Sequence, residues 1–243
     1  MTVLLISDLH LEEERPDITG AFLRFLDEHA SQAETLYILG DFFEAWIGDD
    51  EQSPLQVEIA GQLKRLADAG LNIYLQHGNR DFMIGERFAA EAGLTLLPDP
   101  VVVELGGQPT LLMHGDTLCT ADKEYMKFRS MVRNPQWQAM MLNRPLADRQ
   151  TMARQLREIS KAKNQGKKEE IMDVTPEEVI RVMEEHQVTR LIHGHTHRPA
   201  VHDVTIKGQP GKRYVLGDWD KHFWFIRIHN NQEPELIQQP LAQ

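Results

Sequence analysis

Five short polar clusters each follow directly on an apolar run, and this recurrence constrains the fold more than any other feature of the chain. Each run is long enough for one buried strand, and each cluster stands where that strand would end. Because open α/β sheets bind ligands beyond the carboxyl ends of their strands, we expect the clusters to converge there. They are Asp8-Leu9-His10, Gly40-Asp41, Gly78-Asn79-Arg80-Asp81, His114-Gly115-Asp116 and Gly194-His195-Thr196-His197.

Helical spacing alternates with these runs in the first hundred residues. Apolar residues recur at helical spacing over 18–26, behind Asp17, which we expect to cap that helix. A second helix opens at Ser53-Pro54 and is expected to end near Gly70. The alternation of strand and helix predicts a mostly parallel sheet, and therefore the α/β class.

The second half predicts other connections. Residues 101–105 and 110–113 are joined by too short a segment for a parallel crossover, so we expect a hairpin. Thr175-Pro176, with Glu178, indicates a helix start with a capping box. Residues 200–229 predict a closing antiparallel set of strands, and the last fourteen residues carry little signal.

Composition narrows the class of protein. With 243 residues and 41% hydrophobic content, the chain can bury a large core, and we expect one domain, 1–243. The net charge of −11 argues against nucleic acid as a partner. Cys119 is the single cysteine, which excludes an intrachain disulfide and a cysteine-based zinc site. The amino terminus lacks the basic region of a signal peptide, and no apolar run approaches membrane-spanning length, so we expect a cytoplasmic location.

One stretch departs from the acidic composition. Residues 123–168 hold 12 Lys or Arg against three Asp or Glu, so this segment is +9 while the remainder is −20. Its apolar residues are broken by Pro135 and Pro145, which predicts a helical insertion, about 122–170, over the mouth of the site. Such a stretch is most often a solvated face over a normal core. Its inserted position favours contact with a phosphate-bearing, acylated substrate or an anionic membrane surface instead.

The polar clusters offer metal ligands. Four imidazoles, two carboxylates and an amide exceed what one ion takes, so we infer a two-metal site with Asp41 as the bridge, at a separation of roughly 3.5–4 Å. The mixed nitrogen and oxygen donors favour manganese, iron or zinc, and two Mn²⁺ ions are our first choice. Two ions suit hydrolysis of a phosphate bond. The candidate ligands are Asp8, His10, Asp41, Asn79, His114, His195 and His197.

These motifs, in this order, resemble the calcineurin-like metallophosphoesterase superfamily, and this resemblance implies an αββα sandwich. Three longer stretches are similar to the family that hydrolyses UDP-2,3-diacylglucosamine in lipid A biosynthesis. They are Asp41-Phe42-Phe43-Glu44-Ala45-Trp46-Ile47-Gly48-Asp49-Asp50, His114-Gly115-Asp116-Thr117-Leu118-Cys119 and His193-Gly194-His195-Thr196-His197-Arg198-Pro199.

The resemblance implies manganese-dependent attack of water on the α-phosphorus, giving UMP and 2,3-diacylglucosamine 1-phosphate, at the cytoplasmic face of the inner membrane. We expect a monomer. The implied ligands are Asp8, His10, Asp41 and His197 on one ion, and Asp41, Asn79, His114 and His195 on the other. The implied catalytic residues are Asp41, Asn79, Arg80 and His195. The implied substrate contacts are Asn79, Arg80, Asp122, Arg157, Ser160, Asn164, Lys167 and His195.

Arg80 stands where most superfamily members have histidine. Arginine can bind phosphate through two hydrogen bonds but cannot donate a proton at neutral pH, which favours a leaving group that departs unaided, as in pyrophosphate cleavage. Trp137 and 140–142 would suit acyl chains, or the insertion's own core. Two alternatives stay open: another dinuclear phosphoesterase acting on nucleotides or phosphoproteins, and a non-catalytic membrane-surface module.

Overall fold

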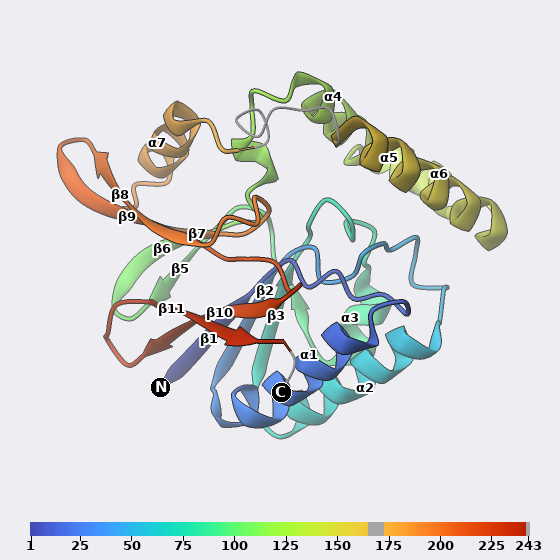
Figure 1. The fold of residues 1–243 in the computed structure, drawn as a ribbon, viewed down its shortest axis with the longest axis horizontal. Helices are drawn as coiled ribbons and strands as arrows, with labels where there is room; N and C mark the ends of the chain where they lie inside the picture. Colours follow the sequence, from blue (N-terminus) through green and yellow to red (C-terminus); the bar gives the residue numbers. More distant parts are fainter. Residues whose placement is uncertain (165–172, 242–243) are drawn as a thin grey trace.

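The computed structural model describes the backbone of residues 1–164 and 173–241, and the side chains of the same residues except 159–164. Its first sheet contains six strands in the order β11-β10-β1-β2-β3-β4 (Figure 1). Strands β1, β2 and β3 pair in parallel, as predicted, and β4 adds a further parallel pair, whereas β10 and β11 pair antiparallel. The strands are β1 (Thr2–Ile6), β2 (Thr35–Leu39), β3 (Asn72–Gln76), β4 (Thr95–Leu96), β10 (His222–His229) and β11 (Glu235–Pro240).

Helices cover the outer face of this sheet: α1 (Pro16–Glu28), α2 (Pro54–Asp68) and α3 (Glu86–Ala92), with the short η1 (Ala30–Gln32) after α1. Ser53 caps α2 in a reciprocal pair with Gln56. The prediction that Asp17 caps α1 was wrong, because Pro16 takes the first helical position and Asp17 falls inside the first turn. Its carboxylate instead binds the Arg15 guanidinium at 2.8 Å.

The second sheet has the order β5-β6-β7-β9-β8, and the predicted hairpin is its β5–β6 pair. The prediction of one closing antiparallel set over 200–229 was partly wrong. Strands β8 and β9 form an antiparallel hairpin, but β9 also pairs in parallel with β7, and β10 crosses to the first sheet. The strands are β5 (Val101–Leu105), β6 (Gln108–Leu112), β7 (Arg190–His193), β8 (Ala200–Ile206) and β9 (Gln209–Val215).

Helix α7 (Pro176–Glu185) packs on the outer face of the second sheet. Pro176 takes the first helical position, as expected, but the predicted capping box is absent. The Thr175 side chain makes no cap hydrogen bond, because its hydroxyl accepts from Thr120 at 2.8 Å. The acidic residues Glu177 and Glu178 in the first turn still stabilise the helix, because their negative charge lies near the positive end of its dipole.

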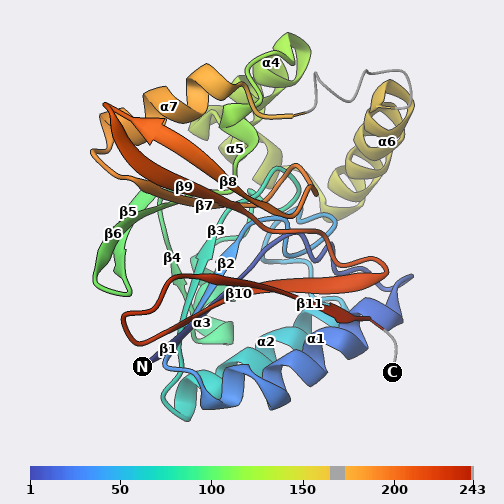
Figure 2. The same ribbon diagram turned by 60° about the vertical axis from the view of Figure 1, so that its left-hand side comes forward.

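Three apolar clusters confirm the αββα sandwich (Figure 2). In β1, Leu4 and Ile6 face the helices of the first sheet, whereas Val3 and Leu5 face the second sheet. A strand that is buried on both faces reads as a continuous apolar run, which explains the pattern before the polar clusters. The third cluster joins the second sheet to α7, where Met183 is fully buried.

Residues 116–164, between β6 and α7, leave the sandwich and form helices beyond the strand ends (Figures 1 and 2). Pro135 begins one helix behind the Asn134 cap, and another begins directly after Pro145, so both prolines divide the segment as predicted. The elements are η2 (Asp116–Leu118), α4 (Lys123–Val132), α5 (Pro135–Leu142) and α6 (Leu146–Asn164).

Candidate metal centre

The carboxyl ends of β1, β2, β3, β6 and β7 meet at one side of the sandwich, and the predicted clusters lie there. Strands β1, β2 and β3 are parallel neighbours in one sheet, and β6 and β7 are parallel neighbours in the other. Residues far apart in sequence therefore converge. The loops after these strands carry Asp8, His10, Asp41, Asn79, His114, His195 and His197.

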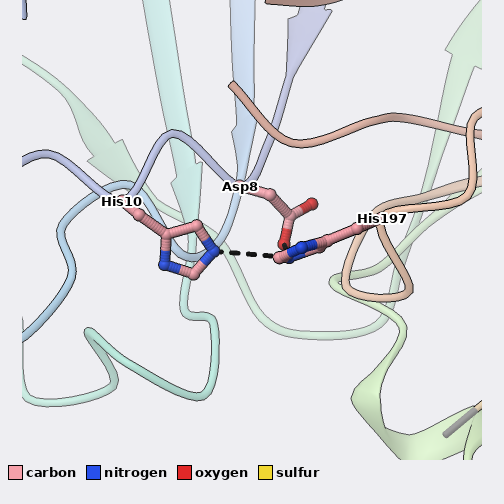
Figure 3. Close-up of side chains that lie close together, drawn as sticks. All are labelled: Asp8, His10 and His197. Atoms are coloured by element: carbon pink, nitrogen blue, oxygen red, sulfur yellow. Dashed lines mark hydrogen bonds and ion pairs between the residues drawn. The ribbon is translucent and has the colours of Figure 1, made fainter. Parts of the chain in front are cut away.

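Asp8, His10 and His197 form the first group (Figure 3). One ligand atom from each lies within 4.8 Å of the others. Nε2 of His197 is 3.4 Å from Nε2 of His10 and 3.4 Å from Oδ1 of Asp8. Two unprotonated ring nitrogens facing each other at this distance repel, so a proton or a metal ion is needed between them.

Asp41, His114 and His195 form the second group, again with ligand atoms within 4.8 Å of one another. The rings of His114 and His195 meet edge to face, with centroids 5.0 Å apart. Oδ1 of Asn79 lies 3.0 Å from Nε2 of His114. This group therefore offers imidazole, carboxylate and amide donors.

Asp41 faces both groups through different oxygens. Its Oδ2 is 3.7 Å from Nε2 of His10, in the first group, and its Oδ1 is 3.7 Å from Nε2 of His114, in the second. A carboxylate placed in this way can contribute one oxygen to each of two cations.

Hydrogen bonds outside the two groups orient their imidazoles. Nδ1 of His10 donates to Oε2 of Glu44 at 2.9 Å, and Nδ1 of His114 donates to the Leu39 carbonyl at 2.9 Å. Each bond leaves Nε2 unprotonated in the neutral ring and aimed at the site, as metal-binding histidines require.

The backbone at the site is strained. A left-handed φ in a residue other than glycine costs on the order of 1–3 kcal/mol and persists only where the surroundings enforce it. Gly78 shows how tightly the loops pack, because a Cβ there would lie 2.1 Å from the backbone nitrogen of Asp41. Five candidate ligands hold such a φ: Asp8 (56°), His10 (51°), Asp41 (50°), His195 (68°) and His197 (55°).

Burial and neighbouring charges shift the pKa values of the histidines at this site. Burial alone would lower the pKa of His114, but the carboxylates of Asp41 and Asp8 raise it to about 9. Burial also opposes protonation of His197, yet the Asp8 carboxylate, 3.4 Å away, raises that pKa to about 9. Burial lowers the pKa of His195 to about 3, helped by the positive charge of His114. The two carboxylates therefore attract positive charge into a buried site.

The residues present fit a pair of divalent cations. Oδ1 of Asp8 is buried and has no hydrogen-bond partner, whereas Oδ2 accepts from Ser7 Oγ at 2.6 Å and from the His195 N–H at 2.9 Å. A buried carboxylate oxygen without a donor is costly unless a cation binds it. The nitrogen and oxygen donors match a transition metal better than calcium or magnesium.

A family model of calcineurin-like phosphoesterases matches residues 1–199. The chain belongs to the calcineurin-like phosphoesterase family. It is 64% identical over 242 residues to a UDP-2,3-diacylglucosamine hydrolase of Marinobacter nauticus, covering 100% of this chain and 99% of the relative. It is 60% identical over 235 residues to a UDP-2,3-diacylglucosamine hydrolase of Ectopseudomonas mendocina, covering 96% and 97%. A hydrolase of the same name from Pseudomonas aeruginosa is 60% identical over 231 residues, covering 95% and 96%.

A cavity of about 480 Å³ joins the candidate centre of this phosphoesterase to the inserted helices. Ligands of both groups line it. Apolar side chains from the loop after β2 and from α4, α5 and α6 also line it, among them Trp46, Ile47, Phe128, Trp137, Met141 and Leu156.

The structure places five of the predicted substrate contacts in this cavity: Asn79, Arg80, Asp122, Arg157 and His195. Asp122 also caps α4 by accepting from the Tyr125 N–H at 3.1 Å. Arg157 reaches from α6 to Glu12, at 3.4 Å. The side chains of Ser160 and Asn164, and the whole of Lys167, lie outside the described residues.

Two residues beside the centre were missed by sequence reasoning. Glu44 is partly buried, with a side chain 12% exposed, and a lone carboxylate among the apolar residues of its motif was the available signal. Tyr125 places its ring 5.9 Å from the His195 ring and donates its hydroxyl to Asp116 at 2.5 Å. Nothing in the pattern of the basic segment distinguishes Tyr125 from the other helix residues.

Proposed function

We propose that this protein hydrolyses the pyrophosphate bond of UDP-2,3-diacylglucosamine, with water attacking the α-phosphorus, to give UMP and 2,3-diacylglucosamine 1-phosphate. The observation that carries this proposal is one cavity that is lined both by residues of the two ligand groups and by apolar side chains. Such a substrate has a pyrophosphate at one end and acyl chains at the other, so it needs both environments in contact. Relatives that cover almost the whole chain carry this hydrolase name.

The proposed centre holds two Mn²⁺ ions, which would polarise the attacked phosphoryl group and activate water. Asp8, His10 and His197 would hold one ion and Asn79, His114 and His195 the other, with Asp41 shared. Arg80 is placed at the cavity wall beside Glu44, at 3.8 Å, where its guanidinium can bind a phosphate oxygen. Asn79 and His195 would contact the substrate phosphate as well as metal.

The insertion, about 122–170, of which residues 165–170 lie outside the described residues, is proposed as a lid that receives the acyl chains, within one domain covering 1–243. Side chains of Phe128, Met141 and Leu156 supply apolar surface to the cavity. Arg157 and Lys167, with Asp122, Ser160 and Asn164, are proposed to contact the polar part of the substrate.

Peripheral binding to the cytoplasmic face of the inner membrane, as a monomer, is also part of the proposal. In the described residues, no helix combines the length and apolarity required to cross a membrane. Met131, Met140 and Leu142 of the inserted helices are about half exposed, in a segment of net charge +9. Apolar side chains amid positive charge favour an anionic lipid surface.

Product analysis in oxygen-18 water tests the reaction. The metal-free protein is assayed on UDP-2,3-diacylglucosamine with and without Mn²⁺, and both products are analysed by mass spectrometry. We expect Mn²⁺-dependent turnover with the label in UMP. Label in the lipid product would exclude attack at the α-phosphorus.

A different phosphoesterase activity would show equal turnover of nucleotide or phosphoprotein substrates without acyl chains. A non-catalytic surface module would bind anionic liposomes in flotation but release no UMP under any metal condition. The complete set of candidate ligands favours catalysis over such a module.

A further inference from the structure

The turn from His77 to Asp81 carries one candidate ligand and packs directly on another. A Cβ on Gly78 would lie 2.2 Å from Oδ1 of Asp41, so the Gly78 backbone touches the shared carboxylate. The Arg80 N–H donates to that same Oδ1 at 2.8 Å. Asn79 stands between these two residues. A small shift of this turn would therefore move Asn79 and the hydrogen bond to Asp41 together.

The turn is held from its other side by the inserted helices. Arg133 caps the carboxyl end of α4, and its Nη2 donates to the Gly78 carbonyl at 2.8 Å and to the His77 carbonyl at 3.3 Å. Its guanidinium also lies over the Phe82 ring, 5.4 Å from the centroid. The charge, the two carbonyls and the aromatic face together fix the guanidinium in one orientation.

Two other arginines of the insertion, Arg129 and Arg149, form hydrogen bonds with two more loops that carry candidate ligands. Nε of Arg129 donates to Asp116 at 2.6 Å, two residues beyond His114. Arg149, only 3% exposed, donates to Oδ1 of Asp50 at 2.8 Å in the loop that follows Asp41. Part of the positive charge of the insertion is therefore neutralised by carboxylates in loops of the sandwich. Of the three arginines, Arg133 acts closest to the ligands, because it binds the residue directly before Asn79.

We propose that Arg133 is a positioning residue of the metal centre, which fixes the 77–81 turn so that Asn79 and Asp41 keep their places. This inference rests on the metal-binding part of the proposed function. Arg133 touches none of the candidate ligands, and its effect passes through the Gly78 carbonyl. The insertion is then part of the metal centre as well as a wall of the substrate cavity.

Variants that separate the donors from the packing test this inference. Arg133→Met keeps an aliphatic side chain beside Phe82 but removes all side-chain hydrogen-bond donors. Arg133→Lys keeps a positive charge and hydrogen-bond donors in a single ammonium group. Arg154→Ala is the matched control, because Arg154 is an exposed arginine of α6 whose side chain reaches Thr151 of its own helix. Mn²⁺ affinity is measured by calorimetric titration of the metal-free proteins, and amide exchange over 77–82 by mass spectrometry.

We expect Arg133→Met to weaken Mn²⁺ binding about tenfold, as removal of supporting hydrogen bonds around metal ligands commonly does, and to speed amide exchange over 77–82. Arg133→Lys should lie between it and the wild type, and Arg154→Ala should match the wild type. Wild-type affinity and exchange in Arg133→Met would overturn the inference. If that variant does not fold, Arg133→Lys decides: several-fold weaker binding supports the inference, and unchanged binding overturns it. Absence of Mn²⁺ binding by the wild type would instead refute the proposed metal centre.

Discussion

His10 donates its Nδ1 proton to Glu44 across 2.9 Å, and this bond aims Nε2 of the same ring at Asp8 and Asp41. Burial would raise the pKa of Glu44, but the hydrogen bond from His10 and the nearby Arg80 lower it, so the carboxylate is held as an anion. An anionic acceptor makes the ring nitrogen on the opposite side a stronger metal ligand.

Replacing this acceptor should weaken the centre. We expect Glu44→Ala to lower Mn²⁺ affinity roughly 10- to 100-fold, because the His10 ring loses its fixed orientation. Calorimetric titration of the metal-free variant measures the change. Glu91→Ala is the control, since Glu91 pairs with Arg87 on the exposed face of α3. Equal affinity of the Glu44→Ala variant and the wild type would count against a supporting role.

Metal should stabilise the fold. At a Mn²⁺ concentration about 100 times Kd, binding contributes about 2.7 kcal/mol to the free energy of unfolding, which corresponds to a Tm rise of roughly 5–10 °C for a chain of this size. Scanning calorimetry with Mn²⁺ or with EDTA measures it. Asp8→Asn should lose most of the rise, and Asp203→Asn, at a 91% exposed side chain, should keep it. A full Mn²⁺ response in Asp8→Asn would contradict the ligand assignment.

Arg80 should favour pyrophosphate cleavage. We expect Arg80→His to lower turnover of UDP-2,3-diacylglucosamine roughly 10- to 100-fold, because a charge-assisted hydrogen bond contributes about 1.5–3 kcal/mol. Steady-state release of UMP measures the loss. Arg87→His, at an exposed arginine of α3, provides the control. Unchanged turnover in Arg80→His would remove this residue from the mechanism.

The apolar side chains that line the cavity should bind acyl chains. Phe128→Ala removes part of that surface, so we expect KM for the diacylated substrate to rise about tenfold. Hydrolysis of bis(4-nitrophenyl) phosphate, which lacks acyl chains, should not change. Ile180→Ala, at a partly exposed residue of α7, is the control. A parallel loss on both substrates would point to damage at the metal centre instead.

Much of the fold could be predicted because strands buried on two faces leave a continuous apolar signal. Leu4 and Leu5 face opposite cores, and the polar residues that follow them mark where β1 ends. Asp41 and His114 converge because β2 and β6, which belong to different sheets, end at the same side of the sandwich. The seven candidate ligands therefore lie where the sequence placed them.

Long-range pairing and support of the site could not be read locally. Strand β10 pairs with β1, so Ile226 lies opposite Leu5, and no local pattern selects that partner over the nearer β9. No residue of β11 is fully buried, so its sequence lacks the alternation of apolar and polar residues that would have predicted a strand. Glu44 acts through its hydrogen bond from His10, and Arg133 acts through hydrogen bonds to two backbone carbonyls. Such hydrogen-bond partners leave no periodic trace in the sequence.

Strands β6 and β7 are hydrogen-bonded neighbours, yet all the inserted helices are strung between them. The pairing of β6 with β7 does not depend on how many residues connect the two strands. The insertion can therefore change in length or sequence while this pairing is kept, provided that contacts such as that of Arg133 with the Gly78 carbonyl still hold the loops of the candidate metal centre. Substrate choice, which depends on the inserted helices, can thus change faster in evolution than the ability to hydrolyse the substrate, which depends on the strand-end loops.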